Sequence, residues 1–268
     1  MAEFNVLVVQ NNAILGNKQA NFNNIEKIIE KYKNKKIDIL VLPEVFAVGW
    51  KCSLFSQYSE KDEQGETSDF LKKLALNYKC FVFGGSYIRK ANDGKLYNTC
   101  NIYSPDGTVI AQYDKMHIFQ HFGEGEADYI AMGKKPVLVE IKGIRIGVSI
   151  CYDIRFPELF RAYSQNNAKI LINMAAWPKI RQKHWEILQK ARAIENQAFV
   201  IAVSQCGRID NEKFNAGHSM IISPFGEIKQ NLLEEEGAFL HKINTNEVDE
   251  IRQNMPVLED KNPYGYKL

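Results

Sequence analysis

The residue with the clearest chemical potential in this sequence is Cys151. It follows an apolar stretch at residues 145–150 that is typical of a buried strand, and the polar residues after it lead toward a predicted helix. A thiol at such a strand-to-helix turn lies near helix amides, whose positive dipole end favours the thiolate, the nucleophilic form. Taken alone, an apolar strand that ends in cysteine is more often a packing feature. Cys151 therefore needs partners before it can be called catalytic.

The partner that a cysteine nucleophile usually requires is a histidine base. The chain has five histidines, and none lies in a context typical of cysteine proteases. His117, His184 and His218 fit hydrogen-bonded structural roles better. Glu44 is an alternative base, because it directly follows a predicted strand at residues 37–42 and a proline. In a dry pocket its pKa would rise and suit proton transfer, although a helix-start carboxylate is an equally good interpretation.

Lys115 could supply the positive charge that such a reaction needs. It lies in Tyr-Asp-Lys-Met-His-Ile-Phe at residues 113–119, between a predicted strand and an aromatic-rich segment. Most lysines point toward water. Held near a thiol, however, the compact ammonium of Lys115 could stabilise a developing oxyanion and help to keep the cysteine as thiolate.

Glu44, Lys115 and Cys151, in this order and each after a predicted strand, resemble the Glu-Lys-Cys triad of the nitrilase superfamily. The resemblance covers nearly the whole chain. It is carried by the motifs Leu-Pro-Glu at 42–44, Tyr-Asp-Lys-Met-His-Ile-Phe at 113–119 and Cys-Tyr-Asp-Ile-Arg-Phe-Pro-Glu-Leu at 151–159. Within the superfamily the sequence is most similar to the ω-amidase-like branch, as indicated by its residues at 176–178, 181, 184–185, 188, 191–198, 217–219 and 251–257.

The resemblance implies hydrolysis of a carbon–nitrogen bond through a thioester intermediate. Glu44 would take the Cys151 proton, and the thiolate would attack an amide carbonyl. Lys115 and the backbone N–H of Tyr152 would hold the oxyanion that forms. No metal, nucleotide or flavin is required, and the sequence has no phosphate-binding glycine loop or zinc-ligand spacing, so we expect no cofactor.

A second active-site glutamate is also implied by the resemblance, and the sequence offers two positions for it. The seven-residue spacing to Gly133 favours Glu126, whereas the count forward from Phe119 favours Glu124. We expect Glu126.

The ω-amidase-like branch implies substrates that are monoamides of dicarboxylic acids, such as α-ketoglutaramate or succinamate. Arg155 and Arg181 are candidates to bind the free carboxylate, although an arginine near the nucleophile is more often a structural ion-pair partner. Of the two we expect Arg181, with Tyr152 and Trp177 beside it, while Trp177 could equally fill the core. Nitriles, N-carbamoyl compounds and deaminated glutathione are alternative substrates, and a non-catalytic binding protein is the alternative of another class.

The elements that must position these residues alternate between strands and helices. A helix at 18–33 separates strands at 4–9 and 37–42. Further strands are predicted at 80–83, 97–103, 108–113, 137–141, 145–150, 168–174, 199–204, 219–222 and on to about 243, and further helices at 70–78, 156–163, 183–197 and 246–254. On the helix at 183–197, Ile187, Ala191 and Ile194, continued by Ala198, predict a buried stripe.

This alternation favours a layered α/β fold with mixed sheets and a single domain over residues 1–268. The resemblance makes the expectation more specific. It implies a four-layer αββα sandwich of the nitrilase type with two mixed β-sheets, assembled as a homodimer or a larger homo-oligomer.

Composition excludes several other classes of function. Thirty-four basic and thirty-two acidic residues leave a formal net charge of +2, too little to indicate a nucleic-acid or membrane partner. No apolar run approaches the ~20 residues of a membrane helix, and no secretory signal opens the chain. The five cysteines form no C-x-x-C pair. We therefore expect reduced thiols, a cytoplasmic location and a small-molecule amide substrate.

Overall fold

One sheet of the structure has eight strands, most of them from the first half of the chain. The computed structural model describes residues 2–121, 124–210 and 212–262. β1 (Glu3–Gln10), β2 (Ile39–Val41) and β4 (Phe81–Phe83) run parallel in this sheet, and β16 (Gly237–Asn244) pairs antiparallel with β1. Its other strands are β3 (Glu60–Lys61), β5 (Tyr87–Lys90), β6 (Leu96–Tyr103) and β7 (Val109–Asp114).

A second sheet has six strands and comes from the middle of the chain. β11 (Ile144–Ile150), β12 (Ala168–Ala175) and β13 (Phe199–Ser204) run parallel at its centre. Antiparallel strands complete it on both sides: β10 (Leu138–Ile141), β14 (Met220–Ile222) and β15 (Ile228–Asn231). β8 (Gln120–His121) and β9 (Glu124–Gly125) form a separate short hairpin.

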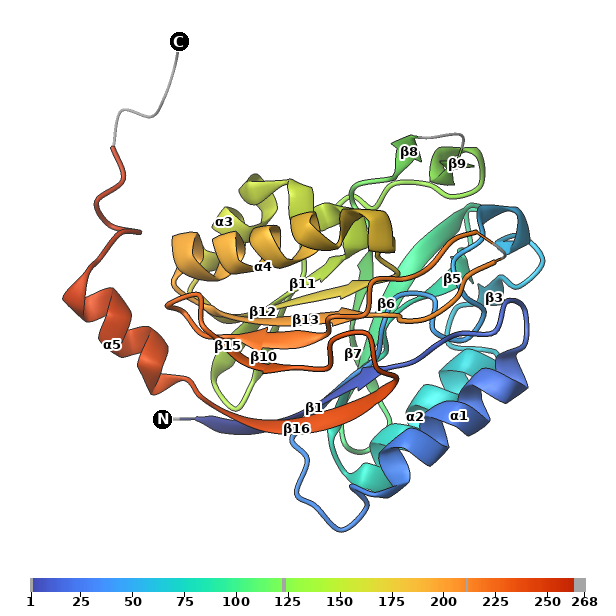
Figure 1. Ribbon diagram of the computed structural model, residues 1–268, viewed down its shortest axis with the longest axis horizontal. Coiled ribbons are helices and arrows are strands. Elements are labelled where there is room, and N and C mark those ends of the chain that lie inside the picture. The colour runs from blue at the N-terminus through green and yellow to red at the C-terminus, as the bar shows by residue number, and fades with distance from the viewer. Residues whose placement is uncertain (1, 122–123, 211, 263–268) are drawn as a thin grey trace.

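Helices cover the outer face of each sheet, so that the fold has four layers (Figure 1). α1 (Lys18–Glu30) and α2 (Glu66–Tyr78) lie on the eight-stranded sheet, α3 (Pro157–Gln165) and α4 (Gln182–Asn196) lie on the six-stranded sheet, and α5 (Asn246–Asn254) follows β16. The 3₁₀ turns within the described part of the chain are η1 (Cys52–Leu54), η2 (Glu126–Asp128), η3 (Cys151–Arg155) and η4 (Lys179–Arg181). The expected αββα sandwich with two mixed sheets is confirmed. No helix among the described residues is long and apolar enough to cross a membrane.

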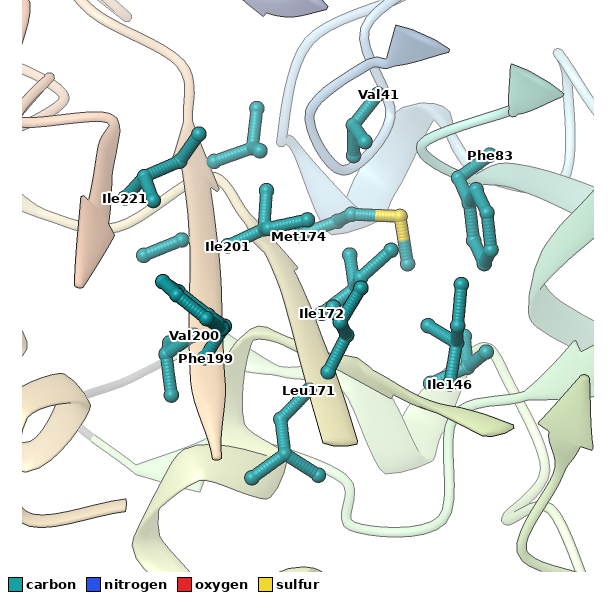
Figure 2. Close-up of a cluster of buried hydrophobic side chains, with 14 of the residues drawn as sticks. Val41, Phe83, Ile146, Leu171, Ile172, Met174, Phe199, Val200, Ile201 and Ile221 are labelled. Carbon is teal, nitrogen blue, oxygen red and sulfur yellow. The ribbon is translucent and has the colours of Figure 1, made fainter. Parts of the chain in front are cut away.

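Apolar side chains fill the space between the two sheets. Figure 2 shows Val41 and Phe83 of the eight-stranded sheet on the same side as Ile172 and Met174 of β12. Leu171 points away from them, because successive side chains of a strand alternate between faces. The β-branched and aromatic residues of the predicted strands thus account for both the sheets and their packing.

The two sheets meet at the edge where the candidate site residues leave their strands. Cys151 directly follows β11 and Lys115 directly follows β7, whereas Glu44 lies three residues beyond β2. The Glu44 carboxylate accepts a hydrogen bond from the backbone N–H of Ala176, which directly follows β12, at 2.9 Å. Because parallel strands end at a common edge, residues far apart in the sequence converge here.

The predicted buried stripe on α4 is wrong at its two isoleucines, whereas Ala198, which continues it, is buried. Ile187 and Ile194 are 64% and 53% exposed, and the face that packs on the sheet carries mainly polar or amphipathic side chains. The buried residues of α4 are Trp185, Gln189, Arg192, Ala193 and Asn196. Their N–H groups donate hydrogen bonds inside the core, as from Gln189 to Asn173 and from Arg192 to the Ile154 carbonyl, and the apolar isoleucines occupy the outer face of the helix.

Candidate active site

Glu44 lies in a tight turn that fixes its carboxylate inside the protein. Val45 has a left-handed φ of 42°, and Gly85 approaches so closely that a Cβ there would lie 2.0 Å from the Pro43 carbonyl oxygen. One carboxylate oxygen of Glu44 accepts a hydrogen bond from the Asn98 amide at 2.8 Å. With the Ala176 N–H on its other oxygen, the Glu44 side chain is fully buried and held from both sheets.

Lys115 extends its ammonium into the same buried space. The backbone anchors its position, because the Lys115 N–H donates to the Asn98 carbonyl at 2.9 Å and its carbonyl accepts from the Gly133 N–H at 2.8 Å. The Lys115 Nζ atom lies 3.0 Å from Glu44 Oε1 and 2.8 Å from both oxygens of Glu126. Only 1% of the Lys115 side chain is exposed, so this lysine does not point toward water.

Glu126 begins the 3₁₀ turn η2 and is as buried as Glu44. Its carboxylate accepts hydrogen bonds from the backbone N–H of Phe119 at 2.8 Å and from the Trp50 indole at 3.3 Å. The alternative residue, Glu124, belongs to β9, and its side chain lies outside the described part of the structure. The described geometry thus brings Glu126 into direct contact with Lys115.

The charges of neighbouring groups shift the pKa values of Lys115 and Glu126. Burial alone would lower the pKa of the Lys115 ammonium, but the adjacent Glu126 and Glu44 carboxylates raise this pKa well above its ordinary value. Burial raises the pKa of Glu126 despite the opposing effect of Lys115, and the Glu44 charge adds to that rise. The ammonium is therefore retained because it separates two carboxylates that would otherwise repel each other in a medium of low polarity.

Cys151 adopts a left-handed conformation, with φ of 50°, at the start of the 3₁₀ turn η3. Burial raises the pKa of its thiol well above the ordinary value, and the Glu44 charge raises it further, while Lys115 acts in the opposite direction. The α-helix α3 begins only at Pro157, six residues after Cys151, and a 3₁₀ turn lies between them. The causes of the pKa shift of Cys151 are thus burial and the neighbouring charges, and a contribution from helix amides stays a prediction.

A cavity of about 850 Å³ opens onto this cluster and contains the sequence-predicted substrate-binding residues. Cys151 and Lys115 form part of its wall, together with Tyr152, Trp177 and Arg181. Glu44 and Glu126 lie behind Lys115 and carry no exposed surface. A small molecule in the cavity can therefore reach both the thiol and the ammonium directly.

Cations and aromatic rings share one wall of the cavity. The Trp177 indole N–H donates to the Arg181 carbonyl at 2.8 Å. The Arg155 guanidinium carbon lies 5.1 Å from the centre of the Trp177 ring system and 5.9 Å from that of Tyr152. Burial, together with the nearby Arg181, lowers the pKa of Arg155. Two neighbouring guanidinium groups at a cavity wall favour an anionic ligand.

Sequence reasoning missed several residues that complete the site. Asn98 holds both Glu44 and the backbone of Lys115, and a polar residue within a buried strand was the only available signal for it. Trp50 and Cys52, which lie between the motifs at 42–44 and 113–119, also line the cavity. Among the described residues, 2–121, 124–210 and 212–262, no group of three or more histidine, cysteine or acidic side chains is arranged to hold a metal.

Comparison with known proteins assigns the arrangement to a family. The sequence pattern of the carbon-nitrogen hydrolases matches residues 5–253. The chain belongs to the carbon-nitrogen hydrolase family. It is therefore an enzyme that hydrolyses carbon–nitrogen bonds, and the expected membership of the nitrilase superfamily is confirmed.

Individual relatives of this carbon-nitrogen hydrolase agree with the assignment. A 2-oxoglutaramate amidase of Bacillus subtilis is 37% identical over 246 residues, covering 91% of this chain and 92% of the relative. The omega-amidase NIT2 of Xenopus tropicalis is 34% identical over 268 residues, covering 96% and 94%. Among solved structures, Saccharomyces cerevisiae Nit3, a member of branch 10 of the nitrilase superfamily, has a TM-score of 0.89 at 27% identity and covers 98% of this chain and 97% of its own.

The electrostatic cluster predicts a pH-dependent loss of stability when its cation is removed. In a Lys115→Met variant, Glu44 and Glu126 face each other without compensation, and we expect the free energy of unfolding to fall by about 3–5 kcal/mol at pH 8. At pH 5.5 the deficit should be smaller. At this lower pH the native state of the variant would bind a proton on one of the two buried carboxylates, whereas the unfolded state, with ordinary glutamate pKa values, would not. Proton binding to the native state alone stabilises the protein, and this stabilisation is lost as pH rises.

Denaturant titrations of the wild type and the variant at both pH values measure this difference. Lys229→Met is the matched control, because Lys229 forms a largely solvent-screened pair with Glu227, and it should change stability by no more than about 1 kcal/mol. An equal deficit for Lys115→Met at pH 5.5 and pH 8 would contradict the proposed charge balance.

Proposed function

We propose that this carbon-nitrogen hydrolase is an ω-amidase that uses Cys151 as nucleophile, Glu44 as acid and base, and Lys115 and Glu126 as charge-stabilising partners. Its substrates are monoamides of dicarboxylic acids, such as α-ketoglutaramate or succinamate. The observation that carries the proposal is the buried Glu44–Lys115–Glu126 network behind a cavity that also exposes Cys151. The names of the relatives, 2-oxoglutaramate amidase and omega-amidase, support the substrate class.

The raised pKa of Cys151 determines how the first step must proceed. A resting thiol is a weak nucleophile, so proton transfer from sulfur to Glu44 accompanies the formation of the bond between sulfur and the amide carbon. The electron pair of the carbonyl moves to its oxygen, and a tetrahedral intermediate forms. Glu44 then returns the proton to the amide nitrogen, the carbon–nitrogen bond breaks, and ammonia departs.

The second half of the reaction hydrolyses the thioester. Glu44 takes a proton from water, the hydroxide attacks the acyl carbon, and the carbon–sulfur bond breaks with the proton returning to Cys151. Lys115 and the backbone N–H of Tyr152 stabilise the oxyanion in both halves. Glu126 holds the Lys115 ammonium in place through two hydrogen bonds.

Recognition of the free carboxylate of the substrate is assigned to Arg181, with Arg155 beside it. A guanidinium binds a carboxylate through two parallel hydrogen bonds, which fixes the orientation of the ligand as well as its charge. Trp177 and Tyr152 supply flat apolar walls for the short carbon chain between the two ends of the substrate. The substrate amide is then directed toward Cys151.

An ammonia-release screen tests the function. We expect the wild-type protein to release ammonia from succinamate and α-ketoglutaramate, and a Cys151→Ala variant to lose at least about a thousandfold in kcat. Cys80→Ala is the matched control, because Cys80 is a buried free thiol that lies before β4; this variant should keep its activity. N-carbamoyl acids, deaminated glutathione and nitriles are assayed alongside. Turnover confined to any of these, or full activity of Cys151→Ala, would contradict the proposal.

The role of Arg181 predicts an effect that depends on substrate charge. An Arg181→Leu variant should raise KM for succinamate about 10- to 100-fold, since a hydrogen bond to a charged group contributes about 1.5–3 kcal/mol. KM for an uncharged amide such as propionamide should hardly change, because that amide has no carboxylate with which Arg181 could form a hydrogen bond. Arg145→Leu, at the opposite end of β11 from Cys151, serves as control. Equal effects on both amides would exclude Arg181 as the carboxylate-binding residue.

We also propose that the protein forms a homodimer through the outer face of α4, defined by Ile187, Ile194 and Phe225. All three side chains are more than half exposed, and the turn after Phe225 lies against Ile194, since a Cβ on Gly226 would come within 2.6 Å of its Cδ1 atom. Exposed apolar side chains gathered on one face favour association.

Light scattering after size-exclusion chromatography tests this assembly. The wild type should have the mass of a dimer, and an Ile187→Asp, Ile194→Asp double variant should shift toward the monomer, because two charges would be desolvated at the interface. Leu76→Asp, on the exposed side of α2, should leave the dimer intact. A monomeric wild type, or a double variant that stays dimeric, would refute this interface.

A further inference from the structure

A buried carboxylate outside the Glu44–Lys115–Glu126 network joins the two segments that carry the reacting groups. Asp153 is fully buried and accepts four hydrogen bonds. One oxygen accepts from the Tyr113 hydroxyl at 2.6 Å and from the Ile150 N–H at 2.8 Å. The other accepts from the N–H of His117 at 3.0 Å and contacts the His117 Nδ1 atom at 2.7 Å.

The positions of these donors are informative. Tyr113 and His117 lie two residues before and two residues after Lys115, Tyr113 within β7 and His117 on the segment that follows it. Ile150 directly precedes Cys151 in the chain, and Asp153 lies two residues beyond it. A single carboxylate therefore bridges the lysine segment, which belongs to the eight-stranded sheet, and the cysteine turn, which belongs to the six-stranded sheet.

The cysteine turn needs such support because its backbone is strained. A non-glycine residue with a left-handed φ, as at Cys151, persists only where its surroundings fix it. The turn is held on its other side by Arg192 of α4, whose guanidinium donates to the Ile154 carbonyl at 3.0 and 2.8 Å. Arg192 fixes the position of the turn relative to α4. Of these two residues, only Asp153 fixes the turn relative to Lys115.

His117 is the part of this bridge nearest the surface. Its ring stacks on Phe156 with a centroid distance of 3.7 Å and an interplanar angle of 9°, which orients Nδ1 toward Asp153. Its side chain is 26% exposed, whereas that of Asp153 is completely buried. His117 can therefore be replaced without opening a large cavity, and the Nδ1 contact can be removed while the stacking on Phe156 is kept.

We propose that Asp153 and His117 are positioning residues that set the placement of the Cys151 sulfur relative to the Lys115 ammonium. The inference rests on the proposed function, in which these two groups act on the same carbonyl. Neither Asp153 nor His117 touches the substrate or moves a proton. The bridge instead keeps the sulfur within reach of Glu44 and keeps the developing oxyanion at Lys115, and displacement of about 1 Å can cost about a hundredfold in rate.

Three variants of the full-length protein test the bridge. His117→Phe keeps the ring stacking and removes the Nδ1 contact. His117→Asn places an amide nitrogen where Nδ1 lies and should restore the contact. Asp153→Asn removes the charge from the centre of the bridge. The control is Asp38→Asn, because Asp38 is another buried carboxylate with several donors, Asn5 and Lys142, and it lies at the opposite end of β2 from Glu44.

Four quantities are measured for each variant: kcat for succinamate, KM for succinamate, the rate at which iodoacetamide labels Cys151, and the midpoint of urea unfolding. We expect His117→Phe to lower kcat about tenfold to a hundredfold, with KM within about twofold of the wild type, and to slow labelling in parallel. His117→Asn should recover most of both rates. Asp153→Asn should lower both rates at least as far as His117→Phe. Asp38→Asn should lower the unfolding midpoint without slowing either rate.

The inference is overturned if His117→Phe keeps the wild-type kcat and labelling rate, or if losses in all variants, including Asp38→Asn, simply follow the unfolding midpoint. Failure of His117→Asn to recover the rates lost in His117→Phe would also overturn it. The labelling rate needs no substrate, so it reports on the bridge even if the assigned substrate is wrong. Failure of the proposed function itself would appear separately, as activity retained in Cys151→Ala.

Discussion

The structure of the site depends on one buried ammonium held between two buried carboxylates. Lys115 could not remain charged in the core without Glu44 and Glu126, and these two could not remain so close to each other without Lys115. Each of the three residues comes from a different segment, at the end of β7, beyond β2 and at the start of η2. The charge balance therefore constrains the relative positions of these segments as strongly as apolar packing does.

Burial is the main cause of the raised pKa of the Cys151 thiol, and the Glu44 charge adds to it, while Lys115 acts in the opposite direction. The charge of Lys115 is partly offset by its two carboxylate partners, Glu44 at 3.0 Å and Glu126 at 2.8 Å. In the proposed mechanism Cys151 loses its proton as it attacks the carbonyl, so between turnovers it reacts more slowly with oxidants and alkylating agents than a standing thiolate would, because these reagents attack the thiolate. The negative charge that develops in this step passes to an oxygen near Lys115.

The layered fold could be predicted from the alternation of strands and helices in the sequence. Glu44, Lys115 and Cys151 were identified as candidates because each follows a short β-rich run, and such a run predicts a strand from local sequence alone. The sequence supported Glu126 over Glu124 less strongly, because the spacing of residues within a loop says little about where their side chains lie until the loop conformation is known. Asn98 was not predicted as a site residue, because its role also depends on contacts that only the folded structure shows. A polar residue in a buried strand becomes informative only when its partners, Glu44 and the Lys115 backbone, are known.

The error on α4 has a physical cause that also concerns the site. Hydrophobic periodicity assumes that the apolar face of a helix packs inward, but α4 uses its inward face for hydrogen bonds. Gln189 donates to Asn173 of β12, and Arg192 donates to the carbonyl of Ile154 in the cysteine turn. Because these bonds must be made inside the core, where an unpaired polar group is costly, they decide which face of the helix is buried. The isoleucines are consequently left on the outside, so the hydrogen bonds that hold the turn at Cys151 also leave Ile187 and Ile194 exposed on the outer face of α4.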